Sequence, residues 1–125
     1  MEAIDLDWVT QAALTVGDVE SAVIFVPRPG ATALELAAAT GIEGPALAGL
    51  VTAVQNPMHP VARAVHEAGA TFDVQPMNPG GPALRSHLPL DGLGVLAVAH
   101  QTSLGDDDRA ALERLATTAT DLLRR

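Results

Sequence analysis

The segment ALRSHLPLDGLGVLAVAH, residues 83–100, predicts two β-strands joined at Asp91-Gly92. Asp-Gly between apolar runs favours a two-residue type I′ turn, because glycine takes positive φ without steric cost. The first strand alternates, with Leu84, Ser86, Leu88 and Leu90 on one face and Ala83, Arg85, His87 and Pro89 on the other. The second strand is apolar or small on both faces, and such an antiparallel strand is expected to be covered on both.

The segments on either side of this hairpin predict an α+β fold with about five to six antiparallel strands. A strand over 21–26, SAVIFV, is also apolar on both faces and is expected to form a hairpin with a strand over 32–39. Spacing and turn residues predict the remaining elements. These are helices over 4–16, 46–54, 60–68 and 106–125, an edge strand over 71–74 and a surface loop over 75–82.

Two helices carry more specific expectations. Trp8, the only tryptophan, is expected to be a core or interface anchor. The last helix has three aspartates in its first turn and two arginines at its end, which suits the helix dipole. We expect its apolar stripe to pack first into the core of the same chain. The stripe is Leu112, Leu115, Ala116, Ala119, Leu122 and Leu123.

Composition excludes several function classes. The chain has 125 residues, 48% of them hydrophobic and 18% charged, which predicts one globular domain over 1–125. The net charge of −8, with seven scattered arginines and no lysine, argues against nucleic acid and anionic membranes as partners. No cysteine is present, which excludes disulfides and thiolate chemistry. With neither a secretory signal nor a membrane-length apolar run, a cytoplasmic location is expected.

Five basic side chains are candidate ligand-binding residues. His59, Arg63 and His66 are spaced i, i+4 and i+7 along the expected helix over 60–68, where they either bind a ligand or form a solvated face. Arg85 and His87 share one face of a strand, and either contact a ligand or are solvated near a sheet edge. The separation of His59 and His66, about 10 Å at 1.5 Å per residue, does not suit a two-histidine zinc motif.

Few features of the sequence indicate a catalytic site or a metal site. Ser86 and His87 are adjacent in a strand, so their side chains point to opposite faces and do not form a nucleophile–base pair. His100 is expected at the surface, at a strand end, and Asp73 is expected to pair with Arg85 or Arg63. The aspartates at 106–108 suit a helix cap better than a metal site. We therefore expect a protein that is not an enzyme and has no metal.

Four segments, in order, resemble a GAF domain, a small sensory module. These are SAVIFV…ALELAAATG, HPVARAVHEAGATFDV, ALRSHLPL followed by LGVLAVAH, and SLGDDDRAALERLATTATDLL. The resemblance implies a sheet with the terminal helices on one face and a small-molecule pocket, enclosed by short helices and loops, on the other. It also implies that terminal helices can pair across a homodimer.

The resemblance is limited by departures from the family's better-known members. The Asn-Lys-Phe-Asp-Glu signature of cyclic-nucleotide binders is absent, and without cysteine neither bilin attachment nor methionine sulfoxide reduction is expected. The function it implies is a sensory domain that binds a small molecule and signals through a partner protein or a dimer. The alternative is a structural dimerisation or protein-interaction module without a ligand. A haem sensor is a third reading, which needs one of the four histidines in the pocket. No cofactor is assigned.

Overall fold

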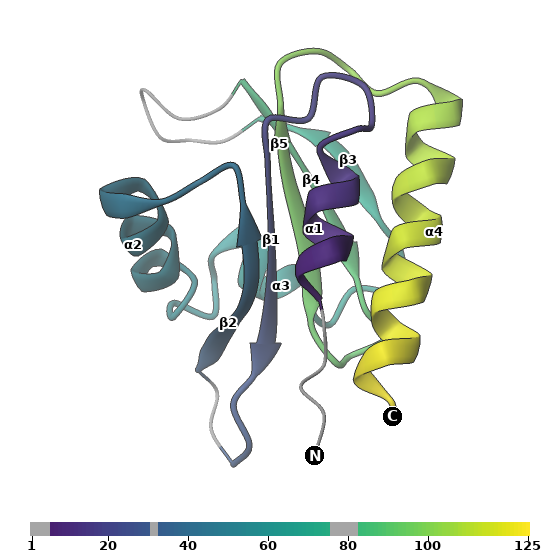
Figure 1. Ribbon diagram of the computed structural model, residues 1–125. Helices are drawn as coiled ribbons and strands as arrows, with labels where there is room; N and C mark the ends of the chain where they lie inside the picture. The colour runs from purple at the N-terminus through teal and green to yellow at the C-terminus, as the bar shows by residue number, and fades with distance from the viewer. Residues whose placement is uncertain (1–5, 31–32, 76–82) are drawn as a thin grey trace.

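A five-stranded sheet lies between two layers of helices in the computed structural model, which describes residues 6–30, 33–75 and 83–125 (Figure 1). Every paired strand is antiparallel, in the order β2-β1-β5-β4-β3. In chain order the elements are α1 (Asp7–Ala13), β1 (Ser21–Pro27), β2 (Leu34–Thr40), α2 (Gly44–Ala53), α3 (Pro60–Ala64), β3 (Thr71–Val74), β4 (Leu84–Pro89), β5 (Val95–His100) and α4 (Asp106–Leu123).

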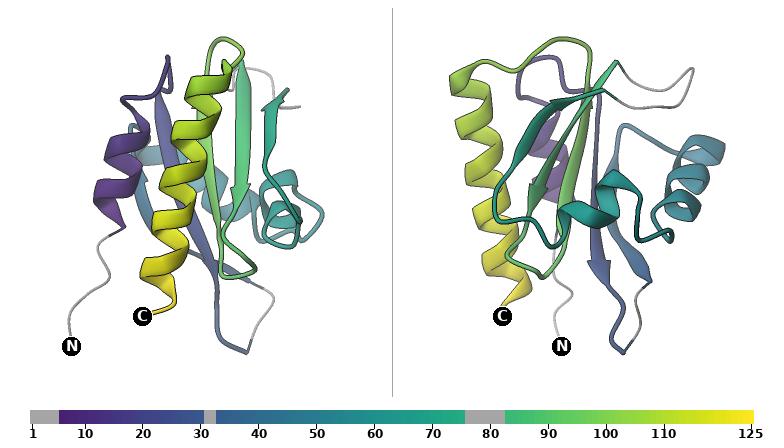
Figure 2. Two further views of the ribbon diagram at one scale, coloured as in Figure 1. Left: turned by 90° about the vertical axis from the view of Figure 1, so that its right-hand side faces the viewer. Right: turned by 180° about the vertical axis from the view of Figure 1, so that it is seen from behind.

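The sheet separates two hydrophobic clusters, as two strands apolar on both faces predict. The terminal helices α1 and α4 cover one face, and α2 and α3 lie on the other (Figure 2). Ile24 and Leu96 face the terminal helices and pack with Leu112 of α4. Phe25 and Val95 belong to the second cluster, beneath α2 and α3. The predicted α+β fold class and the placement of its layers are therefore confirmed.

The β4–β5 connection differs from the predicted two-residue turn. Asp91 and Gly92 have φ values of 56° and 79°, as a type I′ turn requires. The Leu90 N–H, however, donates to the carbonyl of Gly94, and Pro89 pairs with Val95. The loop therefore has three residues rather than two, and β5 begins later than expected.

Two helices end earlier than their sequence pattern predicts. After α3, the backbone N–H groups of Val65, His66 and Glu67 donate to carbonyls three residues earlier rather than four. This tighter pattern ends the α-helix at Ala64, so the expected helix to residue 68 is wrong. The same pattern after α1 ends that helix at Ala13. Of the expected loop over 75–82, only Gln75 lies within the described residues.

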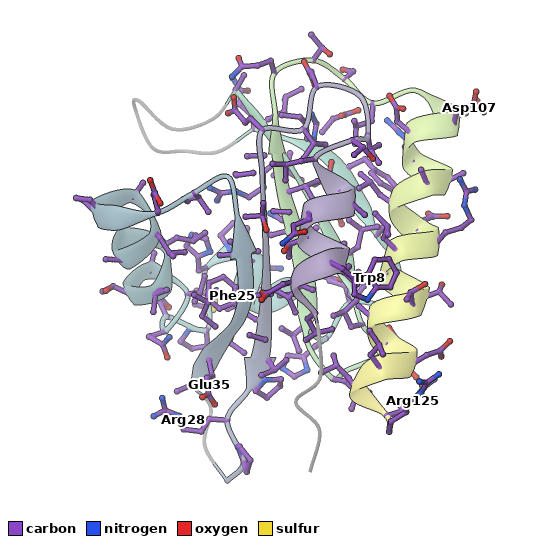
Figure 3. All side chains as sticks on the ribbon, viewed as in Figure 1. Trp8, Phe25, Arg28, Glu35, Asp107 and Arg125 are labelled. Atoms are coloured by element: carbon purple, nitrogen blue, oxygen red, sulfur yellow. The ribbon has the colours of Figure 1, made fainter. Side chains whose placement is uncertain are left out.

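The long helix α4 packs as its apolar stripe predicts. Leu112, Ala116 and Ala119 are buried in the cluster under the terminal helices, and the other stripe residues pack against it. Unlike the stripe of α4, Trp8 is largely outside the core. It projects from α1 on the side of α4 and is 44% exposed (Figure 3). It is therefore not a core residue. Within the described ranges, no helix is both long and apolar enough to cross a membrane.

A polar network lies on the terminal-helix face and corrects two expectations. His100 is fully buried rather than at the surface, and its Nε2 atom is 2.9 Å from the Ser86 hydroxyl. Its Nδ1 atom lies 2.8 Å from the carbonyl oxygen of Thr102, which can only accept. Nδ1 therefore carries the hydrogen, and in the neutral ring Nε2 accepts from Ser86.

Asp73 extends this network to α4. Its backbone N–H donates to the Ser86 oxygen, and its carboxylate accepts from the Leu104 N–H at 3.1 Å and from Arg109 at 2.7 Å. The expected partner of Asp73 was Arg85 or Arg63, so that prediction is wrong. Arg109 reaches the carboxylate from the first turns of α4, whereas Arg85 points to the opposite face of the sheet.

Candidate functional site

Three basic side chains meet on the sheet face that α3 covers. Arg85 and His87 project from β4, opposite Ala99 and Ala97 of β5. His59 precedes α3, which packs against both strands. The charges of Arg85 and His59 both lower the pKa of His87, which places the three groups within electrostatic range of one another. The predicted alternation of β4 accounts for this arrangement.

His87 has the most unusual environment of the three. It is 4% exposed, and its Nε2 atom has no hydrogen-bond partner among the described residues. Burial is the main reason why its pKa falls to about 4, followed by the charges of Arg85 and His59. His87 is therefore neutral at pH 7, and its buried Nε2 atom is left without a hydrogen-bond partner among the described residues.

His59 and Arg85 complete the cluster. The Nδ1 atom of His59 accepts the Val61 N–H at 3.2 Å and so caps α3. With Nδ1 used as an acceptor, the neutral ring carries its hydrogen on Nε2. Burial, and then the charge of Arg85, lower the pKa of His59, and burial lowers the pKa of Arg85.

The other two candidates, Arg63 and His66, lie elsewhere. Both are exposed, and neither is among the charges that shift the pKa of His87. The expected helix does not carry all three residues, because α3 ends before His66, and His59 is half-buried whereas Arg63 and His66 are exposed. The structure does not test the predicted ligand-binding role of these two residues, and their exposed positions outside the cluster make them suitable controls.

His66 instead borders a groove of about 730 Å³ at the end of the sheet. The second half of α4, residues 65–70 and the β4–β5 loop form its walls, which include the ion pair between Asp91 and Arg124. Most of these residues are exposed. Its walls lack a buried polar group in need of a partner, so we take the basic cluster as the candidate site.

The Ser86–His100 pair has the spacing of a nucleophile and its base, but not the access. Both residues are 0% exposed, and the Ser86 oxygen already accepts the Asp73 N–H. A substrate carbonyl has no path to this oxygen, so the pair stabilises the sheet. Sequence reasoning missed the pair, because it depends on the register of β4 against β5. Within the described residues, no group of three or more histidine, aspartate or glutamate side chains could hold a metal ion.

The burial of neutral His87 predicts a specific dependence of stability on pH. Its folded-state pKa of about 4 lies below the unfolded value of 6.5, so from pH 6.5 down to 4 the unfolded chain binds a proton that the folded chain does not. This difference should cost about 3 kcal/mol of unfolding free energy by pH 4. His87→Leu should remove that loss and, by deleting a buried unpartnered nitrogen, add about 1 kcal/mol at pH 7.

Urea unfolding of both proteins between pH 4 and 7.5 measures the effect, since carboxylate titrations cancel in the difference between them. His66→Leu, at an exposed histidine, is the matched control and should follow the parent protein. Parallel pH profiles for the parent and His87→Leu would show that His87 is not buried in its neutral form.

No family model matches the sequence, and no curated protein matches it. Solved structures do match. The second GAF domain of DevS from Mycobacterium smegmatis is 18% identical with a TM-score of 0.69, over 95% of this chain and 90% of that one. A GAF domain from Acinetobacter phosphoenolpyruvate-protein phosphotransferase is 12% identical with a TM-score of 0.74, over 99% and 84%. The chain has the GAF fold.

A third match is to a methyl-accepting chemotaxis protein, residues 122 to 287. It is 18% identical with a TM-score of 0.73, over 99% of this chain and 90% of that one. The resemblance drawn from four sequence segments is thus confirmed for the fold. In this GAF fold the basic cluster lies on the face of α2 and α3, away from the terminal helices.

Proposed function

We propose that this chain is a non-catalytic sensory domain that binds a small molecule at His59, Arg85 and His87. One observation carries the proposal: the Nε2 atom of His87 is buried and has no partner among the described residues. Leaving such a group unsatisfied costs about 1–3 kcal/mol, which a ligand that bonds to it would recover. Costly groups of this kind concentrate at binding sites.

The hydrogen-bond network offers a route from this site to the terminal helices. Ser86 lies between Arg85 and His87 in β4 and points to the opposite face. Through Asp73 it is linked to Arg109 of α4. A ligand that shifts β4 would therefore also change the contacts that hold the start of α4, where we place the output of the domain.

The second candidate function, an interaction module without a ligand, is favoured by a different residue. Trp8 leaves a large apolar side chain exposed beside α4 (Figure 3). Buried aromatic side chains often dominate the energetics of protein interfaces. A homodimer or a complex with a signalling protein through the terminal helices would cover it, and this surface is compatible with a ligand on the other face.

Native mass spectrometry of protein purified from its own host, with an absorption spectrum of the same sample, tests the proposed function. We expect a bound small mass, lost in His87→Leu and kept in His66→Leu, because of these two histidines only His87 belongs to the basic cluster. A Soret band would identify the ligand as haem, and its loss in His87→Leu would identify His87 as the residue that binds the iron. An empty protein at dimer mass, unchanged in thermal stability by a metabolite panel, would favour the interaction module.

A further inference from the structure

Among the described residues, no carboxylate forms an ion pair with the basic cluster. Among the described residues the ion pairs are Asp73 with Arg109 and Asp91 with Arg124, and neither involves the cluster. Asp73 is used on the opposite face of the sheet. Thus no acidic side chain of the described ranges neutralises Arg85, although the chain has 15 acidic residues and only seven arginines.

The Arg85 guanidinium is partly buried without an ion-pair partner among the described residues. Removing a guanidinium from water is costly unless it is paired, which is why buried charges usually have a partner. Arg85 is partly buried, and burial lowers its pKa without an opposing charge to raise it again. His87, two residues along β4, is disfavoured as a cation by the same charge. The site therefore has an excess of positive charge that an anion would relieve.

The geometry also suits an oxyanion. Side chains two residues apart on a strand point to the same face, about 7 Å apart along the chain. A guanidinium donates two parallel hydrogen bonds to a carboxylate or phosphate, and an imidazole Nε2–H can donate a third. The buried Nε2 atom of His87, which has no hydrogen-bond partner among the described residues, marks where this third bond would form.

We propose that the ligand of this site carries an anionic oxygen group, a carboxylate or a phosphate, held between the Arg85 guanidinium and the Nε2 atom of His87. This rests on the proposed function, because it assigns a chemical class to the ligand of the same site. His59 adds a second imidazole donor at the edge of the cluster, where α3 begins.

The test compares charged probes with neutral probes of the same shape. Butyrate is titrated against butyramide, and methyl phosphate provides the phosphate arm, while the ¹⁵N resonance of His87 Nε2 and the melting temperature are followed. We expect butyrate or methyl phosphate to shift the resonance and raise the melting temperature, and butyramide to do neither. The relative affinities of butyrate and methyl phosphate indicate whether the natural ligand carries a carboxylate or a phosphate.

Arg85→Gln should weaken anion binding at least tenfold, since a charge-assisted pair contributes about 1.5–3 kcal/mol. Arg63→Gln removes the same charge from an exposed position and should leave binding unchanged. Equal binding of butyramide, equal loss in both variants, or a His87 resonance unmoved by either anion would overturn the assignment. The native mass measurement decides separately whether the site holds a ligand, so a neutral bound mass would retain the proposed function and reject the anion.

Discussion

Gly94→Ala should destabilise the protein by about 3 kcal/mol. Gly94 lies where β5 begins beside β1, and a Cβ atom placed there would be 2.5 Å from the backbone oxygen of Phe25 and 3.2 Å from a Val26 methyl carbon. Backbone cannot move aside as a flexible side chain can, so the β1–β5 pairing at the centre of the sheet would have to shift. Urea unfolding monitored by circular dichroism measures the loss.

Gly49→Ala is the matched control, because it adds the same methyl group elsewhere. Gly49 lies within α2, and beyond its chain neighbours and the backbone of its own helix no atom lies within 4 Å of the added Cβ. Alanine is preferred in a helix interior, so this variant should gain about 0.5–1 kcal/mol. A Gly94→Ala protein as stable as the parent would contradict the close approach of β1 to this glycine.

Phe25→Ala should cost about 3–5 kcal/mol, the range for truncating a fully buried aromatic side chain. Phe25 is 0% exposed and belongs to the cluster beneath α2 and α3, together with Val61 of α3 (Figure 3). The cavity would loosen the packing of α3, whose N-terminal cap is His59. We therefore expect weaker binding at the basic cluster as well as a lower unfolding free energy.

Phe25→Leu separates the two effects, because it keeps most of the apolar volume and should lose less than about 1.5 kcal/mol. Urea unfolding measures the stability of both variants, and titration with the anion that binds the parent measures affinity. If Phe25→Ala binds that anion as tightly as Phe25→Leu does, α3 is positioned independently of this cluster.

Much of the fold could be predicted because the pattern of each element has one interpretation. β1 and β5, apolar on both faces, are buried on both. The stripe of α4 faces the core, and the alternation of β4 places Arg85 and His87 on one face and Ser86 on the other. These assignments depend only on residues close in sequence, whose periodicity survives folding.

Other features depend on contacts between distant segments. α3 ends at Ala64, and the turns that follow it, which include His66, were not evident from the helical pattern. Asp73 forms its ion pair with Arg109, 36 residues away along the chain, rather than with Arg63 or Arg85, which are closer in sequence. His87 is buried, with no partner for its Nε2 atom among the described residues, only because α3 packs against β4.

The register of the β4–β5 hairpin shows most clearly what sequence determined alone and what tertiary structure decided. Sequence determined both strands and the reversal at Asp91-Gly92. A two-residue turn would have placed Ser86 opposite Ala97 and His100 on the face of Arg85 and His87. Instead Ser86 pairs with Val98, and His100 bonds to Ser86 on the other face. Because β5 is apolar on both faces, either register satisfies the hydrophobic pattern. The observed one places two buried polar side chains, Ser86 and His100, on the same face, where each satisfies the other, and it keeps His100 out of the basic cluster.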